Sequence, residues 1–118
     1  APLCTTGIGK AILANLPPEE WLSRLPEIIP AHTPQTITDK DRILQELQST
    51  RERGFAIDNC EHELNVRCVG VPVYNARGAL VAGISSSGAV QVMTDRKVME
   101  CADILMGITQ RIKERLYA

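Results

Sequence analysis

Residues 66–87 read VRCVGVPVYNARGALVAGISSS, and this stretch decides the fold. Two runs rich in β-branched residues, 66–74 and 79–87, flank Asn75-Ala76-Arg77-Gly78, whose residue types favour a turn. The two runs therefore predict a β-hairpin. Because hairpin strands are antiparallel, a wholly parallel sheet is excluded.

Side chains alternate between the two faces of each predicted strand. One face is mainly branched and apolar, whereas the other is small or hydroxylic. The small face comprises Cys68 and Gly70 on the first strand and Gly83, Ser85 and Ser87 on the second. A small face with a few polar groups leaves a concavity, so it is the candidate pocket.

The turn decides whether Cys68 and the serines share this pocket. A loop of two or four residues pairs Tyr74 with Ala79 and hence Cys68 with Ser85. A three-residue loop with a bulge at Gly78 places them on opposite faces. The turn residues permit both registers.

Four helices are predicted around the hairpin, and the third is expected to end at Gly54. Their N-terminal signals are Thr5-Thr6, Pro18, Thr38-Asp39 and Thr94-Asp95. Apolar residues at helical spacing predict the buried sides: Ile8, Ile12 and Leu16 in the first helix; Trp21, Leu22 and Leu25 in the second; Val98, Cys101, Leu105, Ile108, Ile112 and Leu116 in the last.

A third short strand is predicted at residues 55–58, which gives an α/β or α+β domain with an antiparallel sheet. Three strands are few for four helices. We therefore expect the sheet to be completed by residues outside this chain or by another chain. The chain opens Ala1-Pro2-Leu3 without a methionine, which favours the same expectation.

The composition fits one domain spanning residues 1–118 and a reduced, cytoplasmic setting. Thirteen basic and fourteen acidic residues give a net charge of -1, and aromatic residues are only 3%. With neither a cationic face nor stacking platforms, this chain alone is a poor nucleic-acid binder. No apolar run reaches the length of a membrane span, and we expect no membrane association.

A second candidate site is residues 4–10, CTTGIGK. Its glycines expose backbone N–H groups at a helix start, where an anion is favoured. The Walker spacing is absent, so the residues alone favour a capped surface helix over an anion site.

Other polar residues offer weaker candidates. Cys60 and His62 lie two residues apart near Cys68, but no spacing supports a metal site or a catalytic pair. Asp58 follows a strand end, where a carboxylate accepts either from a ligand or from a backbone amide. Both roles remain open for Asp58.

Taken in order, several segments resemble the C-terminal effector-binding domain of IclR-type bacterial transcription regulators. The segments are Pro2-Leu3, Gly9-Lys10-Ala11, residues 33–39, Glu46-Leu47, residues 51–58, Glu61, Val66-Arg67-Cys68, Pro72-Val73 and Ser85-Ser86-Ser87-Gly88. The resemblance spans nearly the whole chain with compatible spacing.

The resemblance implies a curved antiparallel sheet flanked by helices, similar to GAF and profilin folds and lacking its first strands. It also implies a small carboxylate effector, an oxo acid or sugar acid, as the ligand. Operator DNA would be bound only through a winged helix-turn-helix domain outside this chain. A homodimer or homotetramer is expected, and no cofactor, metal or catalytic residue is implied.

By position, the resemblance assigns effector binding to four side chains and to backbone N–H groups of the helix-start loop. The side chains are those of Asp58, Cys68, Ser85 and Ser87, and the backbone groups are those of Thr6, Gly7 and Ile8. This assignment favours the register that places Cys68 beside Ser85. The sequence departs from the family pattern at Asn65, where glycine is usual, and at Ala89, where proline is common.

Two other classes compete with a transcription regulator. A GAF-like sensory module of another signalling protein would share the fold, and the domain encoded upstream would distinguish it. A small cysteine-dependent enzyme would use Cys68 with His62, although the chain lacks the third member of a triad.

Overall fold

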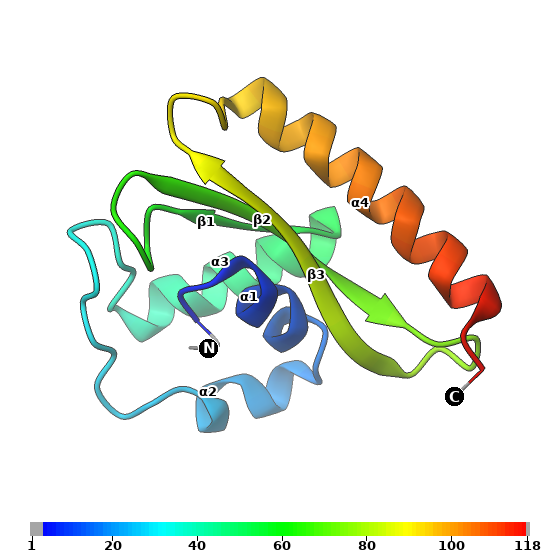
Figure 1. The fold of residues 1–118 in the computed structure, drawn as a ribbon. Helices are drawn as coiled ribbons and strands as arrows, with labels where there is room; N and C mark the ends of the chain where they lie inside the picture. The colour runs from blue at the N-terminus through cyan, green and yellow to red at the C-terminus, as the bar shows by residue number, and fades with distance from the viewer. Residues whose placement is uncertain (1–3, 118) are drawn as a thin grey trace.

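The computed structural model describes residues 4–117. Its elements are α1 (Gly7–Ala14), the 3-10 helix η1 (Pro18–Glu20), α2 (Trp21–Arg24), α3 (Lys40–Arg53), β1 (Ala56–Asn59), β2 (Val66–Tyr74), β3 (Leu80–Ala89) and α4 (Asp95–Arg115). The strands form one antiparallel sheet in the order β1-β2-β3. Helix α4 covers one face of this sheet, and α1 and α3 lie on the other side (Figure 1). The predicted class, helices with an antiparallel sheet, is confirmed.

Side-chain caps fix the starts of three helices where the sequence predicts them. Thr6 accepts a hydrogen bond from the Gly9 N–H, Asp39 from Asp41, and Thr94 from Lys97. Such caps satisfy donors that have no partner inside the helix. At its other end α3 stops at Gly54, whose φ of 91° is left-handed, as predicted.

The buried sides of the first two helices differ from the prediction. In α2, Trp21 is buried but Leu22 is 56% exposed, because a helix of four residues turns only one side to its neighbours. In α1, Leu13 is fully buried, whereas Ile8 and Ile12 are half-buried next to β3. Helix α1 contacts α3 on one side and the sheet on another, which explains why Leu13 is more buried than Ile8 and Ile12.

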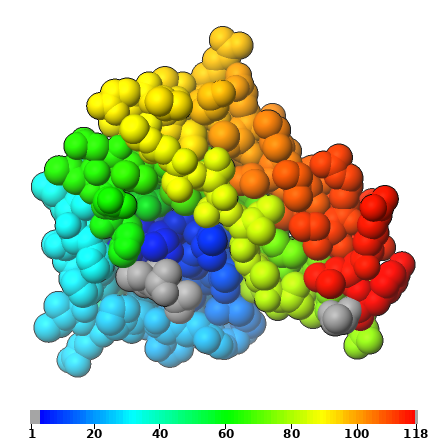
Figure 2. All heavy atoms as spheres, viewed as in Figure 1, coloured from blue at the N-terminus to red at the C-terminus, as the bar shows by residue number. Residues whose placement is uncertain are grey.

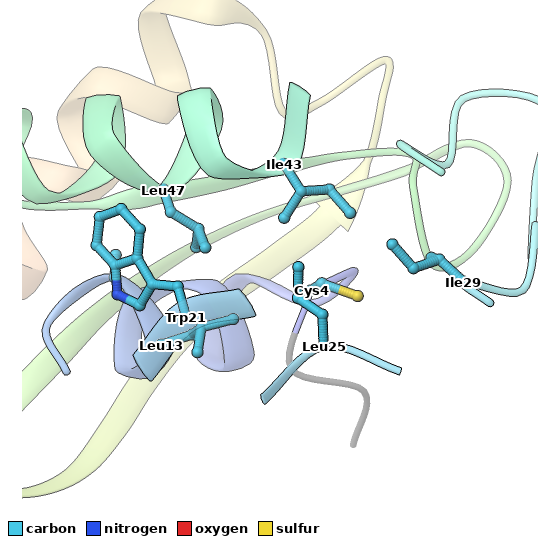
Figure 3. Packing of buried hydrophobic residues seen from close by; sticks show 8 residues of the cluster. Cys4, Leu13, Trp21, Leu25, Ile29, Ile43 and Leu47 are labelled. Carbon is cyan, nitrogen blue, oxygen red and sulfur yellow. The ribbon is translucent and has the colours of Figure 1, made fainter. Parts of the chain in front are cut away.

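Two apolar cores hold the layers together. The first joins α1, α2 and α3 through Cys4, Leu13, Ala14, Trp21, Leu25, Ile29, Ile43 and Leu47 (Figure 3). The second lies between α4 and the sheet and contains Phe55, Val69, Val71, Met93, Val98, Ala102 and Leu105. The branched face of β2 therefore packs against α4, and its small face is turned toward α1.

The hairpin register differs from both predicted alternatives. Cys68 pairs with Ser87, and Gly70 pairs with Ser85, so the expected Cys68–Ser85 pairing is wrong by two residues. The shift arises because Tyr74 pairs with Leu80 after an irregularity at Val73/Tyr74. A displacement by an even number leaves Cys68, Ser85 and Ser87 on one face, as the predicted pocket requires.

The side chain of Asn75 organises the longer connection. Its Oδ1 atom accepts the N–H groups of Arg77 and Ala79, both at 3.0 Å, and Gly78 has a φ of 81°. Within residues 4–117, β3 pairs only with β2 and has a free edge. Completion of the sheet from outside the chain remains a prediction.

Candidate functional site

The small face of the sheet lies directly under the start of α1. A Cβ added at Gly70 would overlap the carbonyl of Gly7, and one added at Gly7 would lie 2.8 Å from Cys68 Sγ. Only glycine at both positions permits this close approach of a helix to a strand. The sequence's two candidate sites, the helix-start loop and the small face, are thus one site.

Three predicted side chains form a row across the sheet, because Asp58 pairs with Cys68 and Cys68 pairs with Ser87. Ser85 lies two residues before Ser87 on the same face of β3, and its hydroxyl forms a hydrogen bond with the Cys68 thiol. Asp58 and Cys68 are buried, whereas Ser85 and Ser87 are exposed. One end of the cluster is therefore a buried carboxyl group, and the other end consists of exposed hydroxyl groups.

The start of α1 closes one side of this cluster. The Gly7 N–H donates to the Cys68 thiol, and the side chain of Thr6 caps the helix. Figure 2 shows the blue start of α1 in a recess between the yellow-green β3 and the green loop that joins β1 to β2. Backbone donors and hydroxyls thus surround a recessed surface, with Ile8 half-buried at its margin.

Burial raises the pKa of Asp58 above its ordinary value. Backbone N–H groups of Glu61, at 2.8 Å, and His62 donate to its carboxyl, and with Lys10 they oppose this rise. Asp58 is thus both an acceptor for backbone amides and a member of the polar cluster. Of the two roles that the sequence left open, the structure shows the backbone-amide role, and the ligand role stays a prediction.

Burial likewise raises the pKa of the Cys68 thiol. The hydrogen bond with Ser85 lowers it, and the charge of Asp58 raises it further. Nucleophilic cysteines need the opposite shift, because the thiolate is the reactive form. His62, the predicted partner of a catalytic cysteine, instead places its Nδ1 3.3 Å from the Thr5 hydroxyl.

The cluster is supported by a buried ion pair that the sequence did not predict. Lys10 Nζ lies 2.6 Å from Glu61 Oε1 and donates to the carbonyl of Ile57, and Glu61 accepts the N–H of Asn59. These bonds satisfy the outer edge of β1, which would otherwise be open to another strand. Because lysine is rarely this buried, nothing in the sequence around Lys10 predicts the pair.

Burial raises the pKa of Glu61 despite the Lys10 ammonium group that lowers it. The backbone N–H of Glu61 is the group that donates to Asp58. The ion pair, the β1 edge and the candidate site are therefore one hydrogen-bonded unit.

The two histidines of the chain, His62 and His32, lie next to each other. His32 and His62 have ring centroids 5.0 Å apart, and the described residues contain no group of three metal ligands. Asn65 has a φ of 64°, which confirms that asparagine accepts the left-handed turn in place of glycine. Pro2-Leu3 lie outside the described residues. No helix within residues 4–117 has the length and apolar character needed to cross a membrane.

The structure is thus an α+β fold with a recessed polar cluster at a helix start, and the raised pKa of the Cys68 thiol does not favour nucleophilic chemistry. The chain matches the family described as "Bacterial transcriptional regulator IclR C-terminal" over residues 1–114. It therefore belongs to the IclR family of transcription regulators, in the part that forms their C-terminal effector-binding domain. Its homologues are transcription regulators and not enzymes.

Individual relatives agree with this assignment. The chain is 34% identical over 105 residues to the HTH-type transcriptional regulator BhcR of Paracoccus denitrificans, covering 88% of this chain and 38% of that protein. Thermotoga maritima IclR superposes with a TM-score of 0.88 at 38% identity, over 98% of this chain and 47% of that one. The inducer-binding domain of Acinetobacter PobR, solved with 3-hydroxybenzoic acid, superposes with a TM-score of 0.88 at 25% identity. This match covers 96% of the present chain and 66% of the PobR chain. The chain thus spans less than half the length of the first two.

Proposed function

We propose that this chain senses a small carboxylate metabolite, an oxo acid or a sugar acid, and thereby controls a DNA-binding domain of the same regulator. The observation that supports this proposal is the convergence of Asp58, Cys68, Ser85 and Ser87 beneath the start of α1. Residues from β1, β2 and β3 meet there, where the Gly7 N–H also points. The chain's membership of the IclR family supports a sensory role for this cluster.

The proposed binding mode uses hydroxyl and amide donors rather than a permanent cation. The hydroxyls of Ser85 and Ser87 and the N–H groups of Thr6, Gly7 and Ile8 would hold the carboxylate, beside Asp58 and Cys68. Neutral donors bind an anion less tightly than a guanidinium does, which suits a ligand that must be released. PobR, whose inducer-binding domain was solved with an aromatic acid, supports a carboxylate ligand.

The proposed organisation places DNA binding outside this chain. With a net charge of -1, residues 1–118 have no overall electrostatic attraction to the phosphate backbone of DNA. A winged helix-turn-helix domain of the same protein would bind the operator, and the present chain would be the C-terminal part of the effector domain. The same proposal includes a cytoplasmic location and assembly into a homodimer or homotetramer.

Calorimetric titration with glyoxylate, pyruvate and gluconate tests the ligand class. One of these acids is expected to bind, and Ser85→Ala combined with Ser87→Ala should weaken it at least about tenfold, since each lost bond to a charged group costs about 1.5–3 kcal/mol. Ser86→Ala, on the opposite face of β3, is the matched control. Unchanged affinity in the double variant would overturn the assigned site.

A further inference from the structure

A cavity lies at the edge of the sheet, between α3 and the edge strand β1. Its volume is about 510 Å³, within the range of small-molecule sites. Its walls come from α3, the 34–37 segment, β1, Glu61 and Arg67. We call it the arginine cavity, because Arg42, Arg53 and Arg67 all line it.

The arginine cavity lies at the outer edge of β1, whereas the effector cluster lies over the small face of the sheet. Arg67 pairs with Asn59, and both alternate with Asp58 and Cys68 along their strands. Because successive side chains of a strand point to opposite faces, Arg67 and Asn59 face away from Asp58 and Cys68. The two sites are neighbours, because Glu61 lines the cavity and its backbone N–H donates to Asp58.

The charges of the arginine cavity leave it cationic. Its two acidic residues already have basic partners: Glu46 accepts Arg53 at 3.0 Å, and Glu61 accepts Lys10 at 2.6 Å. Arg42 forms no ion pair with any residue in the described part of the chain. Its guanidinium group therefore retains its full set of donors for an anion.

Arg67 supplies a second unused donor. One of its terminal nitrogens donates to the carbonyl of Met93 and to Asp95, which fixes the side chain. Its Nε is buried and has no hydrogen-bond partner among residues 4–117. An unsatisfied buried N–H is unfavourable, so an acceptor that reached Arg67 Nε from the cavity would stabilise it.

The rest of the lining indicates what an anion would be attached to. Pro34, Ile37 and Ile57 give the arginine cavity an apolar wall opposite its charged groups. An inorganic ion would leave this wall in water, whereas an organic anion would bury it. Guanidinium groups recognise carboxylates and phosphates through paired hydrogen bonds.

We propose that the arginine cavity is a second ligand site, which binds an organic oxyanion whose charged group contacts Arg42 and Arg67 and whose apolar body lies against Ile37 and Ile57. This site uses other ligand-binding groups than the proposed effector site. It gives the domain a second input at the edge of the same sheet.

The test is an NMR titration of the 118-residue chain with benzoate, phenyl phosphate and acetate, observed at the backbone amides and at the arginine Nε–Hε signals. Saturable shifts of Arg67 Nε–Hε and of residues 34–37 are expected. Benzoate or phenyl phosphate, whichever binds better, identifies the oxyanion, and acetate should bind more weakly than benzoate because it lacks the apolar body. Absence of saturable shifts with all three probes would overturn the proposal.

Variants distinguish this site from nonspecific attraction of anions to surface arginines. Arg42→Gln should weaken binding about tenfold, as expected for losing a charged hydrogen bond, and Arg42→Glu should abolish it. Arg111→Gln, which changes another exposed arginine on α4, is the control and should bind as the parent does. Equal affinities of the Arg42 and Arg111 variants would refute the site. Ser85→Ala with Ser87→Ala should leave these shifts intact, and their loss would place the probe in the effector cluster instead.

Discussion

The two faces of β2 have opposite physical characters within one strand. Toward α4, Val69 and Val71 are fully buried among apolar side chains. Toward α1, Gly70 admits the backbone of Gly7, and polar groups occupy the remaining surface. The first face stabilises the fold by burying apolar area. The second face buries less apolar area and presents a polar surface instead. Four sets of substitutions test this contrast.

The largest effect is expected from the ion pair that supports the polar face. Lys10→Met leaves Glu61 buried without its partner and should lower the free energy of unfolding by about 3–5 kcal/mol. Urea unfolding followed by circular dichroism measures the loss. Adding Glu61→Leu should restore part of it, because the unpaired carboxyl is removed. A single variant as stable as the parent would show that the pair is not buried in solution.

Close packing of the helix start on β2 should give the next largest effect. Gly70→Ala forces a methyl group into the carbonyl of Gly7, and such overpacking against backbone should cost about 3 kcal/mol. Gly88→Ala is the matched control, because nothing lies within 4 Å of its added Cβ. Thermal unfolding of both variants measures the contrast. Equal melting temperatures would mean that α1 does not touch β2.

A direct comparison of the faces uses one truncation on each. Val71→Ala opens a space in the α4 core and should cost about 2 kcal/mol. Ser85→Ala on the exposed polar face should change stability by less than about 0.5 kcal/mol. Chemical denaturation of both variants gives the difference. A reversed order would contradict the division into a stabilising face and a binding face.

The smallest effect concerns pH. Because burial raises the pKa of folded Asp58 above 3.8, its stabilising contribution is complete below pH 3.8 and is lost as pH rises through the folded value. Stability should therefore fall across this window, and Asp58→Asn should make the fall smaller. The slope should not vanish, because the pKa of Glu61 is raised in the same direction. Denaturation at a series of pH values measures both slopes, and an unchanged slope in the variant would refute the role of Asp58.

Local signals in the sequence determined most of the secondary structure. Thr6, Asp39 and Thr94 cap helices through bonds to residues two or three positions away, and Gly54 ends α3 by its own backbone conformation. These interactions depend only on near neighbours, so composition and spacing reveal them. The alternation along β2 and β3 likewise indicated which face is small. Four of the proposed site residues followed from that alternation together with the family resemblance.

Only the tertiary structure decided how these elements meet. The bonds of Asn75 across a five-residue connection and the bulge at Val73/Tyr74 set the register, and no propensity rule gave that combination. Lys10 and Glu61 are 51 residues apart, and the arginine cavity joins α3 to both edge and central strands. Burial of a charge depends on all its surroundings at once, whereas a cap depends on one turn of chain. For that physical reason the sequence by itself determined the caps, the strands and the polar face. Only the tertiary structure decided the ion pair and the arginine cavity.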